Sequence, residues 1–435
     1  MKKCMFVMLL LSCFSALAHS HPVMVAAAET DSLEAMYIEG VEAYNNGDYV
    51  AAVALWKSAA ESGHAMARYD YGLCLYNGTG VGQDYEQAFG WFVKAAVDGV
   101  ADAQFSAGYC CEYGYGIEPS PEDAVEWYTM AASQGYADAE CALGICYYSG
   151  LGIGQDYTLA VEWLRRAAEK GNAEAQSYLG TCYANGYAVA KDDFEAASWY
   201  GKAAKNGNLE GIYNLAYCYE WGLGVEGDSW VAMDLYEKAA KEDFAEAQYA
   251  LALCYLDVHC GNDKKHAVEW LEKAARNGVA DAQYTMGLIC SEGTILPKDD
   301  EKAVMWFTQA AEAGHADAQC DLGFCYLTGK GVAGNVRAAV LWFAKSAAQE
   351  NARAQHNMGV CCYEGLGLEQ DYEKAVEWFT LASEQGNVDS KYYLGVCYYN
   401  GQGVAADRSK GVKLIKKAYR EGSKEASKAL VYLNS

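Results

Sequence analysis

Proline and positive charge are both scarce in this 435-residue chain. Only four prolines occur, and no polar low-complexity tract is present, which argues against long disordered linkers. Lys and Arg number 33 against 58 Asp and Glu, so the formal net charge is −25. Nucleic acids and anionic membrane surfaces are polyanions that need Lys and Arg for neutralisation. The composition therefore argues against both as partners, whereas a cationic ligand is compatible with it.

Long apolar runs are also missing after the first residues, because no later run reaches the ~18 residues that a membrane span requires. The opening is different: two lysines precede an apolar stretch that ends at Leu17, with small residues at positions 16 and 18. This pattern predicts a secretory signal cleaved after Ala18, and we interpret residues 1–28 as signal peptide and short leader. We expect the mature protein to be exported, periplasmic or secreted, with a lipid anchor at Cys13 as the alternative.

Internal repetition is what the chain has in abundance. The residue four places before each Ala-Ala step, or its equivalent, recurs at intervals of 36, with one interval of 35. These positions are Leu55, Trp91, Trp127, Trp163, Trp199, Leu235, Trp270, Trp306, Trp342, Trp378 and Leu414. Such a period is typical of a tandem array, in which neighbouring units bury the apolar faces that a single unit cannot. We therefore predict one extended solenoid in which the eight tryptophans have a structural role.

Each repeat is predicted to contain two helices, and residues 101–135 show why. Apolar residues from Ala103 to Cys111 recur at helical spacing on one face. A segment with Gly and Pro then interrupts the pattern. A second helical segment begins at Pro121 and stops before Gly135, which suits the start and the end of a helix respectively. The repeat unit is thus a first helix, a loop, a second helix and a short turn.

Two kinds of residue are expected to shape these helices. Asp84, Asp156 and Asp371 directly precede second helices and are predicted N-caps. A glycine recurs inside the first helix, as at Gly108 and Gly144, where it costs up to about 1 kcal/mol relative to alanine. We expect this cost to be offset by a close approach of the second helix at its Ala-Ala step.

The two ends of the chain differ from the internal repeats. Residues 33–63 are four residues shorter between matching glycines, because a tight turn replaces the usual Gly-x-Gly-Val loop. Residues 423–435 form a lone, lysine-rich first helix. We interpret these two segments as caps that flank ten repeats in residues 64–422.

The repeated signature resembles the Sel-1-like repeat (SLR) family, a relative of the tetratricopeptide (TPR) repeat. Residues 388–404 carry A-x-Y-x-L-G-x-x-Y-x-x-G-x-G-V nearly intact, and residues 371–386 carry D-x-x-x-A-x-x-W-x-x-x-A-A-x-x-G. The resemblance covers essentially the whole mature chain. It implies an all-α fold, a right-handed solenoid superhelix of helix-turn-helix repeats, and a scaffold that binds proteins or peptides without enzymatic activity. A fold does not settle a function, so this role is an expectation.

Cysteine recurs two residues after the helix glycine in nine repeats, from Cys74 to Cys397, and Ile289 takes the slot in another. An isoleucine fits a buried apolar slot and cannot act as a metal ligand. Stacked repeats advance by roughly 10 Å, the spacing of packed helices, which is too far for a disulfide between successive cysteines. We therefore predict packed, reduced thiols that behave as small apolar side chains. Cysteine-rich relatives bridge their two helices through a C-x7-C pair, and that spacing is absent here.

The resemblance also implies that the first helices line a concave face, with ligand-facing positions at offsets −6, −3, +1, +4 and +5 from the helix glycine. Carboxylates beside aromatic rings suit a peptide with Lys or Arg side chains, so we predict a protein or peptide partner, possibly basic. The predicted binding residues are Asp102, Asp138, Glu174, Glu210 and Glu246 at −6, Tyr213, Tyr249, Tyr284 and Tyr392 at −3, and Trp221 at +5. The alternative is that the tyrosines pack between repeats and the acids form a solvated face near the helix starts.

Patterns for catalysis or metal binding are sparse. No Gly-x-Ser-x-Gly elbow or P-loop occurs, and His64 and His315 share one inter-repeat turn, which predicts a structural role for both. His259 and His266 flank Cys260 in the one irregular loop, where we expect a hinge or local bend. We predict no catalytic residue, no metal and no cofactor. The rival interpretation is a binder of cell-envelope ligands such as peptidoglycan or β-lactams, or a weak hydrolase, as the cysteine-rich relatives suggest.

Overall fold

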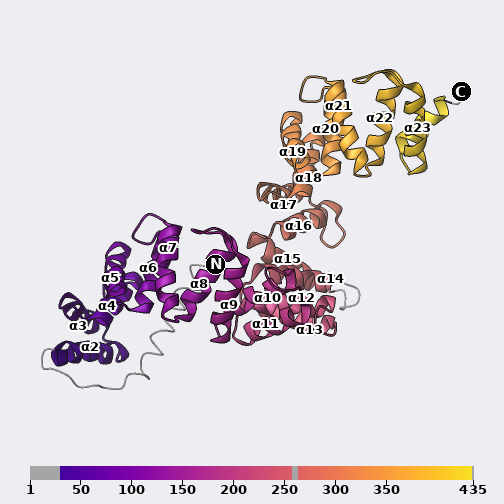
Figure 1. The fold of residues 1–435 in the computed structure, drawn as a ribbon. Helices are drawn as coiled ribbons and strands as arrows, with labels where there is room; N and C mark the ends of the chain where they lie inside the picture. Colours follow the sequence, from indigo (N-terminus) through magenta and orange to yellow (C-terminus); the bar gives the residue numbers. More distant parts are fainter. Residues whose placement is uncertain (1–29, 257–262, 434–435) are drawn as a thin grey trace. The chain divides into compact units, whose positions relative to one another are not determined.

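The computed structural model describes residues 30–256 and 263–433, in which all regular secondary structure is α-helical (Figure 1). Two compact units, Met1–Asp228 and Ser229–Ser435, divide the chain. The first contains α2 (Thr30–Asn45), α3 (Tyr49–Glu61), α4 (Ala65–Asn77), α5 (Tyr85–Val97), α6 (Ala101–Tyr113), α7 (Pro121–Ser133), α8 (Ala137–Ser149), α9 (Tyr157–Glu169), α10 (Ala173–Asn185), α11 (Asp193–Lys205) and α12 (Leu209–Trp221). The second contains α13 (Ser229–Lys241), α14 (Ala245–Leu256), α15 (Lys264–Arg276), α16 (Ala280–Glu292), α17 (Asp300–Glu312), α18 (Ala316–Thr328), α19 (Val336–Ala348), α20 (Ala352–Glu364), α21 (Tyr372–Glu384), α22 (Val388–Asn400), α23 (Arg408–Arg420) and α24 (Lys424–Leu433).

Even-numbered helices are the first helices of the predicted repeats and are called A helices below, and odd-numbered helices are called B helices. Within each unit, every helix packs against the helix before it and the helix after it. Several successive A helices also contact one another, as α8 and α10 do in the first unit and α20 and α22 in the second. The prediction of an all-α solenoid of helical hairpins is therefore confirmed. The predicted leader and the loop with His259 and Cys260 lie outside the described residues.

The predicted N-caps are confirmed. The Asp84 carboxylate accepts a hydrogen bond from the backbone N–H of Gln87 at 2.9 Å, and Asp156 and Asp371 cap their B helices in the same way. Most A helices end at a glycine in the left-handed region, such as Gly114 with φ of 73°. A capping carboxylate satisfies an N–H that the helix itself leaves unpaired, so these residues fix where each B helix starts.

The second glycine of the Gly-x-Gly loop allows one hairpin to rest on the previous one. Gly116 has φ of 75°, and a Cβ built on it would lie 2.1 Å from the carbonyl oxygen of Tyr85 at the start of α5. Gly403 meets the carbonyl oxygen of Tyr372 in the same way, also at 2.1 Å. Both the backbone conformation and the close contact favour glycine at these two positions, although Ala188 takes the corresponding position in another repeat with φ of 55°.

The glycine inside each A helix also marks a close contact, but the predicted partner was wrong. A Cβ on Gly108 would lie 2.7 Å from the ring of Tyr128, and a Cβ on Gly323 would lie 2.7 Å from the ring of Phe343. The residue opposite the glycine is therefore the large one that follows the repeat tryptophan, and not the Ala-Ala step. The sequence pattern could not reveal this, because the ring sits one helical turn before the alanines on the same buried face.

The prediction of packed thiols is confirmed for the described cysteines. Thirteen of them are free and buried, while Cys254 is half-buried. Burial raises the pKa of Cys74 to about 12 and that of Cys182 to about 11, so both thiols stay protonated at neutral pH. Ile289, which replaces cysteine in one repeat, is buried as well.

Candidate binding surfaces

The −6 acids mostly contact the next hairpin. Asp138 accepts a hydrogen bond from the side-chain amide of Asn172 at 2.8 Å, and Asn172 is the N-cap of the following A helix. Burial raises the pKa of Asp138 and of Asp102. The same link joins an acid to the N-cap of the following A helix at four other places: Glu34 with His64, Asp281 with His315, Asp317 with Asn351, and Asp389 with Ser423. Among the predicted acids, Asp138 therefore holds consecutive hairpins together, as four acids of other repeats do.

The histidines of the inter-repeat turn belong to these links. Nδ1 of His64 accepts from the backbone N–H of Ala67 at 3.0 Å, while Nε2 lies 3.0 Å from the Glu34 carboxylate. Nδ1 must carry a lone pair to accept, so Nε2 carries the proton and donates it to the acid. His315 makes the corresponding pair of contacts in the second unit. The predicted structural role of both histidines is confirmed.

A smaller part of the acidic row remains on the surface. Glu174 is half-buried, and Glu210 and Glu246 are exposed. Glu174 and Glu210 belong to the first unit, where tyrosines of earlier A helices face them. Glu246 lies at the start of α14 in the second unit. These three are the predicted acids that a partner could reach most easily.

Tyrosines and acids of the first unit lie within electrostatic range of one another across two hairpins. Burial raises the pKa of Tyr109 and Tyr113 on α6, and Glu174 on α10 adds to both shifts. Burial likewise raises the pKa of Tyr148 on α8 to about 12, with a contribution from Glu210 on α12. An acid thus faces a tyrosine that lies two A helices earlier. We call this surface the inner face of the first unit: Tyr109, Glu112, Tyr113, Tyr148, Glu174, Tyr178 and Glu210.

Exposed aromatic rings continue the A-helix surface on α12. Trp221 is 62% exposed, and its ring lies 6.2 Å from that of Tyr217, which is 46% exposed. Tyr213, the predicted binding residue on the same helix, is half-buried. Trp221, predicted at offset +5 as a binding residue, is therefore a large side chain open to solvent.

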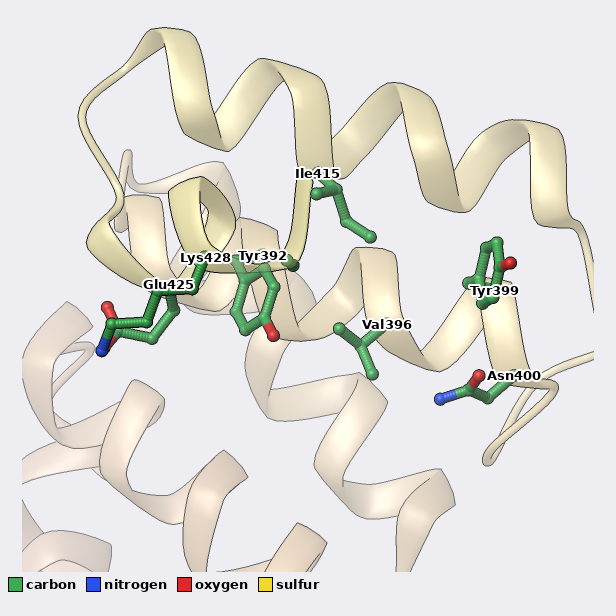
Figure 2. Close-up of a pocket in the computed structure, with 8 residues that line it drawn as sticks. Tyr392, Val396, Tyr399, Asn400, Ile415, Glu425 and Lys428 are labelled. Atoms are coloured by element: carbon green, nitrogen blue, oxygen red, sulfur yellow. The ribbon is translucent and has the colours of Figure 1, made fainter. Parts of the chain in front are cut away.

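The predicted tyrosines of the second unit have different surroundings. Tyr249 is half-buried, whereas the Tyr284 hydroxyl donates to Asp321 at 3.0 Å and its ring lies 4.5 Å from that of His315. Both partners of Tyr284 belong to the next hairpin, so this tyrosine packs between repeats. Tyr392 lines a cleft between α22, α23 and α24 (Figure 2).

The eight repeat tryptophans lie at the edge of the core. Trp199 and Trp306 are buried, and the other six are half-buried. On five of them a cation from the following helical turn covers the ring, at 3.4 to 4.3 Å from the centroid: Lys94 on Trp91, Arg166 on Trp163, Lys202 on Trp199, Lys273 on Trp270, and Lys345 on Trp342. Such contacts contribute about 0.5–1 kcal/mol each at exposed sites, which indicates a packing role for the tryptophans.

A set of polar residues that the sequence interpretation missed joins three helices at a time. Gln104 on α6 donates to the carbonyl oxygen of Ala96 on α5 at 3.0 Å, and accepts from the side chain of Gln134, the C-cap of α7, at 2.8 Å. We call such a pair a clamp. Its first member lies four residues before the A-helix glycine, and its second member is the C-cap of the B helix in the same hairpin. Amide clamps also occur at Gln176–Asn206, Gln248–Asn277, Gln319–Gln349 and Gln355–Gln385. The sequence signal that could have revealed the clamps is a glutamine that recurs next to a buried alanine near the start of the A helices.

Three clamps are ionic, and their polarity is not constant. Buried Glu140 lies 2.8 Å from both Arg166 and Lys170, and Lys170 is the C-cap of α9. The charges are reversed in the other two clamps, Arg68–Asp98 and Lys391–Glu421. Eight hairpins of the described residues thus carry a matched pair of their own.

The chemistry of these surfaces favours binding. Thirteen of the described thiols, which would be the strongest nucleophiles, are buried, and burial raises the pKa of each of them. In residues 30–256 and 263–433, no group of three or more His, Cys, Asp and Glu side chains is placed to hold a metal ion. No helix of that same part is long and apolar enough to cross a bilayer.

Comparison with known families gives one match, which spans nearly all of the described residues. The model for the Sel1 repeat matches eleven consecutive segments: residues 33–64, 65–98, 101–136, 137–172, 173–208, 209–244, 245–279, 280–315, 316–351, 352–387 and 388–423. A search of curated proteins found no match.

Two solved structures are similar over most of the chain. One is a protective antigen of uropathogenic Escherichia coli with an SLR fold, at 32% identity and a TM-score of 0.67, covering 92% of this chain and 87% of that one. The other is a Sel1 repeat protein from Oxalobacter formigenes, at 32% identity and a TM-score of 0.51, covering 71% of this chain and 90% of that one.

Proposed function

Because this chain belongs to the Sel1 repeat family, whose members typically act as scaffolds in protein–protein interaction, we propose that it is an exported, non-enzymatic scaffold. Its partner is a protein or peptide segment rich in Lys and Arg. The inner face of the first unit, together with Trp221 and Tyr217 on α12, binds this segment. Export rests on the signal-like residues 1–28.

One observation carries the proposal: the A helices α8, α10 and α12 contact one another in turn, and the ring of Tyr148 on α8 lies 5.4 Å from that of Tyr178 on α10. Because successive A helices lie side by side, Glu174 on α10 and Glu210 on α12 lie on the same surface as these tyrosines. A surface that carries carboxylates and phenol rings attracts Lys and Arg both by charge and by contact with ring faces. An extended or helical segment is the ligand shape that a row of parallel helices accommodates.

The acids supply the test, because Tyr284 holds a neighbouring hairpin and its substitution would disturb the fold. The pair Glu174→Gln and Glu210→Gln removes two charges and keeps the side-chain shapes. Binding of a fluorescent Lys/Arg-rich nonapeptide at 50 mM salt should weaken about fivefold, since exposed charge pairs contribute about 0.2–1 kcal/mol each. Trp221→Ala should weaken it further by removing an exposed ring.

The matched control is Glu122→Gln with Glu126→Gln, two exposed acids on the B helix α7. This control should leave the affinity unchanged. Equal affinity of the inner-face pair and the control pair would refute the proposed surface. Thermal stabilisation by muropeptides or benzylpenicillin, with none by the basic peptide, would instead support the rival class of envelope-ligand binder.

A further inference from the structure

Four residues join the first hairpin, α2–α3, to α4. Glu34 on α2 lies 3.0 Å from His64, the N-cap of α4, and the ring of Tyr37 stacks on that of His64 with 4.6 Å between centroids. The Tyr37 hydroxyl donates a hydrogen bond to Asp70 on α4. Tyr37 is 8% exposed and Asp70 only 1%. The first hairpin thus docks on α4 through a buried ring and a buried carboxyl group.

The second unit contains the same arrangement at the same repeat positions. On α16, Asp281 lies 3.3 Å from Nε2 of His315, the N-cap of α18, and the ring of Tyr284 lies 4.5 Å from that of His315. The Tyr284 hydroxyl donates to Asp321 on α18 at 3.0 Å. Asp321 also pairs with the guanidinium of Arg353, which belongs to the next A helix, α20. A cation therefore compensates this carboxylate.

The arrangement in the first unit has an acid where the second has that cation. Arg353 lies six residues before the glycine of its A helix, and the residue at the same position of α6 is Asp102. Asp102 is half-buried, and its negative charge adds to the rise in the pKa of Asp70. The two sites thus share their acid, tyrosine and histidine, but the charge beside the second carboxyl group is reversed.

No group that acts on Asp70 can supply a positive charge. Its titratable neighbours are Tyr37 and Tyr44 on α2, Cys74 on α4 itself and Asp102 on α6. Helices α3 and α5 also pack against α4, and within the described residues they add no ionisable partner. Tyr, Cys and Asp ionise only to anions. Since the buried Oδ1 of Asp70 also has no hydrogen-bond partner among the described residues, the docked arrangement favours the protonated carboxyl group.

The position of the first hairpin allows it to open by itself. Among the described helices, α2 packs against α3, and α3 packs against α4, so this hairpin has a described neighbour on one side only. In a repeat array each unit is stabilised by its own contacts and by those with its nearest neighbours. Units at an end therefore open with a lower free energy than internal ones. A charge on Asp70 can be relieved by separation of this one hairpin, which gives the carboxylate access to water.

We propose that α2–α3 is a pH-sensitive hairpin, which docks on α4 while Asp70 carries a proton and separates from α4 when that proton is lost. Separation uncovers the face of α4 that Tyr37 now covers. The corresponding hairpin of the second unit, α16–α17, does not respond in this way, because Arg353 neutralises Asp321.

The direction of the effect follows from the two states of Asp70. Burial raises the pKa of Asp70 to about 7 in the docked hairpin, and access to water returns the carboxyl group to its ordinary range near pH 4 in the open one. Between about pH 4 and pH 7 the docked state binds more protons than the open state does, so docking weakens as pH rises. The effect is complete above that range and absent below it.

Hydrogen exchange measured by mass spectrometry at pH 5 and pH 8.5, expressed as protection factors, tests the proposal. Protection of α2 should fall at least about 30-fold from the lower to the higher pH, since each pKa unit changes the opening equilibrium tenfold. Asp70→Asn should remove this fall, because its side chain stays neutral. Asp102→Arg should also remove it, because it gives Asp70 the cation that Asp321 has in Arg353. Helix α16 is the internal reference and should keep its protection within about threefold.

The matched control is Glu39→Gln, which removes an exposed acid of α2 and should leave the full pH dependence in place. Circular dichroism at pH 5 checks that the three variants keep their helical content. The same fall in protection in Asp70→Asn and in the unmodified protein would overturn the proposal. An equal fall in α2 and α16 of the unmodified protein would also overturn it, because the opening would then not be confined to the first hairpin.

Discussion

The hairpins α6–α7 and α8–α9 have helices of equal length and the same loop plan, yet different chemistry holds them together. In α6–α7 the clamp is an amide pair, in which the side chain of Gln134 donates to Gln104. In α8–α9 the clamp is ionic, with buried Glu140 between Arg166 and Lys170. One backbone geometry therefore accommodates neutral and charged clamps, provided that the two members are complementary.

Complementarity within a hairpin has a consequence for assembly. A buried carboxylate that lost its own cations would have to share the site with a neutral amide or another acid, at a high desolvation cost. Since the polarity of Arg68–Asp98 and Lys391–Glu421 is opposite to that of Glu140–Lys170, exchanged A and B helices would often be mismatched. Repeats that are nearly identical in backbone thus differ where a wrong pairing would be costly.

The largest effect is expected from reversing one charge of the ionic clamp. Glu140→Lys would place a third cation beside Arg166 and Lys170 at a site with no exposure. The free energy of unfolding should fall by about 3–5 kcal/mol, the usual cost of an uncompensated buried charge. Urea unfolding followed by circular dichroism measures this loss.

Three further variants compare the two hairpins. Adding Lys170→Glu to Glu140→Lys should restore part of the stability, because it restores one opposite charge. Gln104→Lys should cost less than Glu140→Lys, since its clamp partner is neutral. Glu162→Lys, on the exposed side of α9, should change stability by no more than about 0.5 kcal/mol. A loss of the same size in Glu140→Lys and Glu162→Lys would mean that the ionic clamp contributes nothing.

Asp70 provides a second comparison with Glu140, because both are buried carboxylates of the first unit. Asp70 is 1% exposed, no cation of the described residues pairs with it, and its main polar neighbour is Tyr37. Burial raises the pKa of Asp70 to about 7, and Asp102 on the next A helix adds to the rise. The charged form of Asp70 is therefore disfavoured in the folded protein.

The pH dependence of stability should follow from this shift. Between about pH 4 and pH 7 the folded state binds more protons at Asp70 than the unfolded state does, so the free energy of unfolding falls as pH rises. Asp70→Asn removes this contribution. The variant should match the unmodified protein at pH 4 and exceed it by about 2–4 kcal/mol at pH 8, given about 1.4 kcal/mol per pKa unit. Parallel stability curves between these pH values would contradict the assignment.

Much of the fold could be predicted from the sequence, because helix periodicity, caps and glycines are local signals. The 36-residue spacing of the tryptophans predicted the hairpin array. Asp84 and Asp156 predicted the starts of two B helices, and both are N-caps in the structure. The contact opposite the A-helix glycine was predicted wrongly. The residue that contacts Gly108 depends on which turn of the B helix lies opposite this glycine. The spacing of apolar side chains along the B helix does not determine which turn that is.

The candidate surfaces were less predictable for a related reason. The acids at offset −6 form a continuous row in the sequence, yet Asp138 is drawn into a link with Asn172 while Glu210 stays exposed. Whether an acid binds its neighbour depends on the N-cap of the following hairpin, 34 residues away. The clamps were missed because their two members are separated by 30 residues, and only the hairpin geometry brings Gln104 to Gln134.

The smallest predicted effect is a gain in stability at an incomplete clamp. Gln283 donates to the carbonyl oxygen of Ala275 at 3.0 Å, but its own buried Oε1 has no hydrogen-bond partner in the described residues. The C-cap of α17, where other hairpins carry Gln or Asn, is Ala313. Ala313→Gln would supply the donor that Gln349 supplies to Gln319 at 2.9 Å in the next hairpin. Stability to urea should rise by about 0.5–1.5 kcal/mol. Ala313→Glu is the matched control, because its carboxylate has the same length but cannot donate, and an equal gain there would show that the clamp is not the cause.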